Sequence, residues 1–329
     1  MSLFNPFRGA FGLDMSDCEV KVVQLKQCFG LGKISHKLNF KTKFSLPEGL
    51  IVDGQIQKPE IVIEHLKNHL FSKNRPHLEK PWVVASLPES KTFIKVITLK
   101  APRVDLASQM IIEEASKHLP FALEEVYLDW HILTRSRQAK EVKILLAAAP
   151  KNIADSYTYL LNIAGMTPLA FEAESLVIAR SVISPKNLPK NSAVAILDLD
   201  NCRSNFLLFD NPKSLEEEGS IKFSLTLPFS GHGKEELEDL SKKIKEAINF
   251  YQLHFPHGSP LKSVMICGDL AKLPGLEKSL ALKLKLKTYL ADPTINLLGN
   301  QKLKEELTDP SLAAAIGLAM RALVKPFNN

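Results

Sequence analysis

Two aspartates stand at the ends of predicted strands that each turn back into a second strand. Asp14 closes the apolar run Ala10–Met15, and Asp198 closes the apolar run Ser192–Asp198. Either aspartate could serve as a catalytic carboxylate. The alternative is that both aspartates are polar strand ends without a ligand. The surrounding elements decide between these two interpretations.

The composition is that of an ordinary globular protein. The 329 residues correspond to two domains at ~150 residues each, and 45% hydrophobic with 24% charged residues excludes a disordered chain. The net charge of +6 is too small for a nucleic-acid-binding stripe. There is no C-x-x-C pair and no secretory signal pattern, and the longest apolar stretches fall short of the ~20 residues that span a bilayer. We therefore expect a soluble cytoplasmic protein.

The apolar patterns of the two halves predict the same order of elements: a strand hairpin, a third strand, a helix and a further strand. In the first half the expected elements are strands Ala10–Met15, Glu19–Leu25, Lys37–Leu46 and Trp82–Leu87 and helix Pro59–Phe71. In the second half they are strands Ser192–Asp198, Ser204–Phe209, Ile221–Leu227 and Ser263–Cys267 and helix Lys234–Leu253. Duplicated α/β halves leave a cleft between them, which is a common place for a ligand.

A compact α+β module interrupts the first half. Its five expected elements are strands Phe93–Leu99, Glu125–Leu133 and Val142–Ala148 and helices Leu106–Leu119 and Ile153–Ala164. Helices Gly275–Leu286 and Ser311–Leu323 and strand Pro168–Glu172 complete the expected fold.

Three lysines near the end of the helix expected over Gly275–Leu286 alternate with leucines: Lys283, Lys285 and Lys287. This pattern would suit a membrane surface, or a helix end that leads into an edge strand whose lysines are solvated. We expect the edge strand.

Several segments resemble a known family. The two hairpins that end in Asp14 and Asp198, with the late loop Gly268–Gly275, resemble the phosphate and adenosine segments of actin-like ATPases. Within that superfamily the chain resembles the PilM family of type IV pilus assembly, which is related to FtsA. The segments that carry the resemblance are LPEGLIVDG (46–54), VVASLP (83–88), HLPFALEEVYLDW (118–130), AAAPKNIADSY (147–157), FEAESLVIAR (171–180) and SLAAAIGLAMR (311–321).

The resemblance implies an α/β fold of the actin-like, FtsA-like kind, with duplicated halves and an SHS2-like subdomain 1C. It implies subdomain 1A at 1–90, 168–191 and 311–329, subdomain 1C at 91–167, subdomain 2A at 192–225 and 262–310, and a reduced subdomain 2B at 226–261. In the family ATP lies in the cleft, and the cytoplasmic tail of the membrane protein PilN binds in a groove between 1A and 1C.

The same resemblance supplies the candidate cofactor-binding residues, which would hold ATP and Mg²⁺ if the site still works. They are Asp14, Lys21, Asp198, Ser204, Gly268 and Gly275. No metal site and no catalytic residue is assigned beyond these.

Four departures from the family pattern argue against ATP hydrolysis. In the first loop Ser16 replaces a glycine, and Asp17 and Glu19 replace serines; in the second loop Asp200 replaces a glycine. The adenosine loop keeps Gly268 as one of three glycines, and most of subdomain 2B is missing between Leu227 and Lys234. Carboxylates beside a triphosphate would repel it, and side chains at glycine positions obstruct close backbone approach. The three extra acids would form a solvated rim or, as the weaker alternative, a cation site.

We therefore expect a pseudo-ATPase scaffold of type IV pilus assembly. It would be cytoplasmic, peripheral at the inner face of the cell membrane, and would bind the tail of a PilN-like protein. Other platform or motor proteins are expected partners, with self-association also possible on this fold. The alternative functions are an active Mg-ATP-binding ATPase of the same machinery and, as a weaker candidate, a relative of the sugar or acid kinases.

Overall fold

The computed structural model describes residues 7, 9–30, 33–71, 78, 81–184, 187–231 and 233–324. The chain divides into two compact units. Unit 1 comprises Met1–Pro88, Ile153–Ser184 and Ala291–Asn329, and unit 2 comprises Glu89–Asn152 and Pro185–Leu290. Each unit contains a five-stranded sheet.

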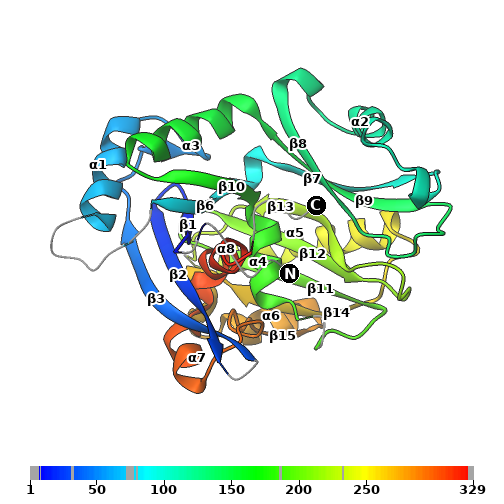
Figure 1. The fold of residues 1–329 in the computed structure, drawn as a ribbon. Helices are drawn as coiled ribbons and strands as arrows, with labels where there is room; N and C mark the ends of the chain where they lie inside the picture. The colour runs from blue at the N-terminus through cyan, green and yellow to red at the C-terminus, as the bar shows by residue number, and fades with distance from the viewer. Residues whose placement is uncertain are drawn as a thin grey trace. The chain divides into compact units, whose positions relative to one another are not determined.

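The sheet of unit 1 has the strand order β10-β6-β1-β2-β3 (Figure 1). Its strands are β1 (Phe11–Met15), β2 (Glu19–Gly30), β3 (Lys33–Ser45), β6 (Trp82–Leu87) and β10 (Thr167–Ala173). β1 and β2 form an antiparallel hairpin, while β6 runs parallel to both β1 and β10. All five residues of β1 are buried, because helices cover the centre of the sheet.

Helices α4 (Glu174–Val182) and α8 (Ala313–Ala322) pack against each other, and α8 lies across β1 and β2 (Figure 1). Two glycines permit this contact. A Cβ at Gly12 would lie 2.4 Å from the backbone nitrogen of Ala319, and a Cβ at Gly317 would lie 1.9 Å from the carbonyl oxygen of Val177. Either side chain would push α8 away from its neighbour.

The remaining elements of unit 1 surround this sheet. They are the short strands β4 (Ile51–Val52) and β5 (Gln55–Ile56), the helices α1 (Pro59–Leu70), α3 (Lys151–Ile163) and α7 (Gln301–Leu307), and the 3₁₀ turn η5 (Pro310–Leu312). α3 packs beside the β4–β5 hairpin, where the fully buried Tyr157 donates a hydrogen bond from its hydroxyl to the carbonyl of Gly54, at 3.1 Å.

The sheet of unit 2 repeats the arrangement, with the order β13-β12-β11-β14-β15. Its strands are β11 (Ser192–Leu199), β12 (Ser204–Asn211), β13 (Ser220–Leu227), β14 (Leu261–Cys267) and β15 (Lys287–Leu290). β12 runs antiparallel to both β11 and β13, and β14 runs parallel to both β11 and β15. When the strands of each sheet are numbered by their order in the chain, both sheets have the spatial order 3-2-1-4-5. This repetition is the duplication expected of the actin-like fold.

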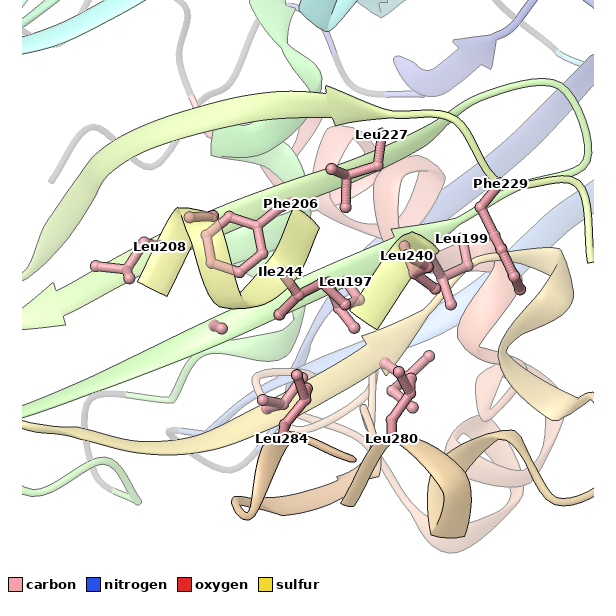
Figure 2. Packing of buried hydrophobic residues seen from close by; sticks show 14 of the residues in the cluster. Leu197, Leu199, Phe206, Leu208, Leu227, Phe229, Leu240, Ile244, Leu280 and Leu284 are labelled. Carbon is pink, nitrogen blue, oxygen red and sulfur yellow. The ribbon is translucent and has the colours of Figure 1, made fainter. Parts of the chain in front are cut away.

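Figure 2 shows the core of this sheet. Phe206, Leu208 and Leu227 of the strands face Leu240 and Ile244 of α5 (Lys234–His254), and all are buried. Leu280 and Leu284 bring α6 (Leu276–Leu284) into the same cluster. Residues 226–261, for which a reduced subdomain 2B was expected, contain α5, which packs into the core of the second sheet.

Unit 2 also contains the three strands and the first helix of the expected module, whereas its second expected helix, Ile153–Ala164, corresponds to α3 and belongs to unit 1. The elements of the module in unit 2 are β7 (Phe93–Leu99), β8 (Val126–Ile132), β9 (Val142–Pro150) and α2 (Ser108–Ser116), with the 3₁₀ turns η1 (Glu89–Lys91), η2 (Arg103–Asp105) and η3 (Leu123–Glu125); η4 (Asp269–Lys272) follows β14. The strand order is β7-β9-β8, and Ile111 and Ala115 of α2 pack on Ile97 and Ile144.

A β-bridge and an ion pair attach this module to the second sheet, next to a buried group of charges. Thr134 and Glu217 form an isolated β-bridge, and Lys143 Nζ lies 2.7 Å from Glu217 Oε2. Burial lowers the pKa of Lys222, and the carboxylates of Asp210 and Glu217, 3.8 and 3.9 Å from its Nζ, partly oppose this shift. A buried ion pair of this kind fixes one geometry, because breaking it would leave an uncompensated charge.

Most of the expected elements are present within one to three residues of their expected bounds. Two helices were not predicted: α4, whose residues Glu174–Val182 continue directly from β10, and the short α7. Lys283, Lys285 and Lys287 lead into an edge strand, as expected, since Lys287 begins β15 at the edge of its sheet.

Candidate functional site

The first hairpin places Asp14 and Lys21 opposite each other. The two residues are cross-strand partners of β1 and β2, and both are buried. Ser86, in β6, donates a 2.8 Å hydrogen bond from its hydroxyl to Asp14 Oδ1. Ser86 was not among the expected site residues, although it ends a strand predicted to lie beside the first.

Glu19 is not part of a solvated rim, contrary to expectation. Its carboxylate is buried between two lysines, with Oε2 3.5 Å from Lys21 Nζ and Oε1 3.0 Å from Lys43 Nζ. Lys43 comes from β3 and could not be inferred from the loop sequence. The two lysines therefore balance the negative charge of Glu19, which was expected to repel a phosphate.

Asp17 closes a neighbouring turn rather than facing solvent. Its Oδ2 accepts a hydrogen bond from the backbone N–H of Asp53 at 2.8 Å, and its Oδ1 accepts one from the N–H of Gly54 at 2.9 Å. Asp53 and Gly54 both have positive φ, 49° and 72°. The Asp17 carboxylate thus occupies a pair of adjacent N–H donors of the kind that can bind an anion.

The second hairpin carries Asp198 in the corresponding place. The thiol of Cys267, at the end of β14, lies 3.5 Å from Asp198 Oδ1. The Ser204 hydroxyl is fully buried and donates to the carbonyl of Phe229 at 3.3 Å. The hydroxyl proton of Ser204 is therefore already donated to a backbone carbonyl.

Gly268 and Asp200 join the second hairpin to the loop after β14. A Cβ at Gly268, where φ is +88°, would lie 2.5 Å from the carbonyl oxygen of Leu199, so only glycine fits this close approach. Asp200 Oδ1 accepts a 2.9 Å hydrogen bond from the backbone N–H of Asp269. Asp200, which stands where a glycine was expected from the family pattern, thus binds the N–H of the residue that follows Gly268.

Gly275 lies apart from this loop contact, at the start of α6. It has φ +80° in the left-handed region, and nothing lies within 4 Å of where its Cβ would be. Its role in the structure is conformational, as the residue that turns the chain into the helix. The structure thus groups Asp14 with Lys21 in unit 1 and Asp198 with Ser204 and Gly268 in unit 2.

A cavity of about 430 Å³ adjoins the second hairpin, and its lining is acidic. The residues that line it are Asn201, Cys202, Pro228, Phe229, Ser230, Glu235, Glu236 and Asp239. Glu236 is held in place by Ser230, whose hydroxyl donates to Oε1 at 2.6 Å. Three carboxylates around one cavity would repel a polyphosphate.

These contacts do not fit the requirements of a bound triphosphate. The carboxylates of Asp17 and Asp200 accept the backbone hydrogen bonds that an anion would need, and the hydroxyl of Ser204 donates elsewhere. The expected alternative of a cation site also lacks support: within the described ranges no three His, Cys, Asp or Glu side chains are grouped so that they could hold a metal ion.

The fold and the paired aspartate hairpins define an actin-like protein. The family model of type IV pilus assembly protein PilM matches residues 12–217 and 227–323. The chain belongs to this family.

A solved structure supports this fold, and two weaker matches follow it. A chain of a "PilM-PilN type IV pilus biogenesis complex" matches with TM-score 0.77 and 19% identity, over 96% of this chain and 99% of that one. Ethanolamine utilization protein EutJ from Carboxydothermus hydrogenoformans matches with TM-score 0.49 and 12% identity, over 94% and 88%. MreB 5 of Spiroplasma citri bound to AMPPNP matches with TM-score 0.46 and 10% identity, over 94% and 95%.

Among the described residues, no helix combines the length and the apolar character needed to cross a membrane.

Proposed function

We propose that this chain is a pilus assembly scaffold that binds the N-terminal tail of a PilN-like membrane protein and does not hydrolyse ATP. The role in type IV pilus assembly follows from the family to which the chain belongs. The partner and the loss of hydrolysis are the parts proposed here.

One observation carries the loss of hydrolysis. Two of the three acids that depart from the family pattern accept hydrogen bonds from the backbone of a neighbouring turn: Asp17 from the N–H groups of Asp53 and Gly54, and Asp200 from the N–H of Asp269. A carboxylate held in this way is an internal anion. A phosphate that entered either turn would have to displace it and would then remain beside its negative charge.

The partner proposal draws on the relative whose structure is a PilM-PilN complex and which matches over 96% of this chain. In this chain, subdomain 1C would comprise residues 91–167. The other proposed subdomains are 1A (1–90, 168–191 and 311–329), 2A (192–225 and 262–310) and a reduced 2B (226–261). Contact with the tail of a membrane protein would hold the chain at the inner face of the membrane.

The module offers an apolar segment for such a tail. Phe121 is 40% exposed and follows α2, and Tyr127 on the edge strand β8 is 52% exposed. An extended peptide can add to a sheet edge through its backbone while apolar side chains fill neighbouring positions. We therefore place part of the tail-binding surface near Phe121.

Titration of the purified chain with the N-terminal peptide of its PilN-like protein tests this proposal. We expect saturable binding, which Phe121→Ala should weaken about tenfold, since aromatic anchors dominate peptide interfaces. Leu253→Ala is the matched control, because Leu253 is also exposed but lies on α5. Equal binding by both variants would exclude Phe121 from the surface, and absence of binding by the unmodified chain would overturn the partner.

The alternative is an active ATPase of the same machinery. What favours it is the retained pair Asp14 and Lys21, both buried in cross-strand register, with Ser86 bonded to Asp14. Direct titration with Mg-ATP separates the two proposals.

A further inference from the structure

Positive charge is concentrated in one segment of unit 2. Between Leu261 and Leu290 the sequence has six lysines, no arginine and two acidic residues, in a chain whose net charge is +6. The segment forms β14, α6 and β15 in succession.

α6 has two faces with different chemistry. Leu276, Leu280 and Leu284 point into the core of the second sheet, where Figure 2 shows Leu280 and Leu284. Lys278 and Leu282 lie on the opposite face and are exposed, and Leu282 is 80% exposed. Lys285, the C-cap residue of α6, follows them at the spacing i, i+4, i+7 that keeps residues on one side of a helix.

Lys287, two residues after Lys285, begins the edge strand β15. It is exposed, and its Nζ lies 5.4 Å from the ring centre of Tyr289, which is half-buried. We call Lys278, Leu282, Lys285 and Lys287 the basic patch. Lys283 is excluded from it because its ammonium is paired with Glu238, whereas Lys278 and Lys285 form no ion pair within the part of the chain that the structure describes.

The chemistry of the basic patch distinguishes a lipid surface from a protein partner. Protein interfaces are depleted in lysine, and their strongest contacts come from Trp, Tyr and Arg; the patch has neither Trp nor Arg. Arginine is also the residue that binds single phosphates in a fixed bidentate geometry, while lysine acts as a point charge. The negative surface potential of an anionic leaflet attracts lysines as point charges, and an exposed leucine beside them can add apolar contact.

We propose that the basic patch rests on the anionic surface of the membrane, with the three ammonium groups at the headgroups and Leu282 directed toward the acyl boundary. This contact goes beyond binding of a membrane-protein tail and does not depend on it. Each lysine near an anionic leaflet contributes about a fivefold change in partition. Three lysines and one leucine give reversible binding, weaker than that of a lipid-modified chain.

Co-sedimentation with vesicles tests the proposal. The chain is mixed with phosphatidylcholine vesicles that contain either no anionic lipid or about 30% phosphatidylglycerol, at about 50 mM and about 500 mM salt. We expect binding only to the anionic vesicles, and loss of most of it at high salt because the attraction is screened.

Charge-reversed variants show which surface is responsible. Lys278→Glu with Lys285→Glu should weaken vesicle binding at least about 25-fold. The control is Lys242→Glu with Lys245→Glu, which makes the same change in net charge at exposed positions of α5 and should retain most of the binding. Leu282→Ser, at an exposed position, should weaken binding without lowering the stability of the fold.

Two results would overturn the proposal. The first is absence of binding to anionic vesicles by the unmodified chain at low salt, in which case the patch has another, acidic partner. The second is an equal loss in the two double variants, which would mean that net charge and not this patch governs binding. Neither result affects the titration with the PilN-like peptide, so the two proposals fail separately.

Discussion

The hairpins β1–β2 and β11–β12 hold the same position in their sheets but differ in chemistry at their ends. In both, an aspartate ends the first strand and accepts a hydrogen bond from the end of a parallel neighbour. In the first hairpin Asp14 receives the Ser86 hydroxyl at 2.8 Å. In the second, Asp198 receives the Cys267 thiol at 3.5 Å. A thiol is a weak donor, so this hydrogen bond is the weaker of the two.

Charge distinguishes the two hairpins further. The first keeps a buried group of Glu19, Lys21 and Lys43 joined by ion pairs, whereas in the second Ser204 is bonded to the carbonyl of Phe229. The two share one feature, since an acid after each strand end accepts backbone N–H groups: Asp17 in the first and Asp200 in the second. Both hairpins thus have an acid that accepts backbone hydrogen bonds just after the first strand.

The largest expected effect concerns the glycine that brings the second hairpin close to the loop after β14. Gly268→Val should lower the free energy of unfolding by about 3 kcal/mol or more, because its side chain would meet the backbone of Leu199 in a conformation with positive φ. Urea denaturation measures the change. Gly275→Ala is the control: its φ is also positive but the space around it is open, so only about 1 kcal/mol of strain is expected. Similar losses in the two variants would show that close packing is not what requires Gly268.

Truncation of the two aspartates tests how firmly each is held. We expect Asp14→Ala to cost about 2 kcal/mol, because it leaves the buried Ser86 hydroxyl without its charged acceptor. Asp198→Ala removes the acceptor of the Cys267 thiol, which is a weaker donor than a hydroxyl, and we expect a smaller cost of about 1 kcal/mol. Thermal and urea unfolding of both variants give the comparison. A larger loss at Asp198 would show that the type of donor does not decide how much each aspartate stabilises the fold.

The smallest effects are expected at the two internal anions. Asp17→Ala removes an acceptor of two backbone N–H groups and should destabilise the chain by about 1 to 2 kcal/mol, whereas Asp200→Ala removes an acceptor of one and should cost about 1 kcal/mol. Hydrogen exchange of the Asp53, Gly54 and Asp269 amides is the most local measurement. Unchanged protection of these amides in the variants would mean that the carboxylates do not hold the turns.

Much of this arrangement could be predicted from the sequence because it is local. The apolar alternation that ends at Asp14 and at Asp198 marks both hairpins, and repetition of the same element order indicates the duplicated fold. The resemblance of segments such as 118–130 to the PilM family agrees with the family model.

The contacts that change the interpretation are not local. Asp17 binds the turn at Asp53, which lies 36 residues further along the chain, and Asp200 binds Asp269 across 69 residues. From the sequence both acids could be assigned only a charge, and the expectation of a solvated rim followed from it. Lys43 likewise reaches Glu19 through the pairing of β2 with β3, which strand patterns alone do not specify to the residue.

Calorimetric titration of the full chain with Mg-ATP tests the central claim most directly. If Asp17 and Asp200 act as internal anions, the titration should give no heat beyond dilution at millimolar nucleotide. Saturable binding with a micromolar dissociation constant would contradict this account, because the two turns would then have to release their carboxylates and accept a triphosphate.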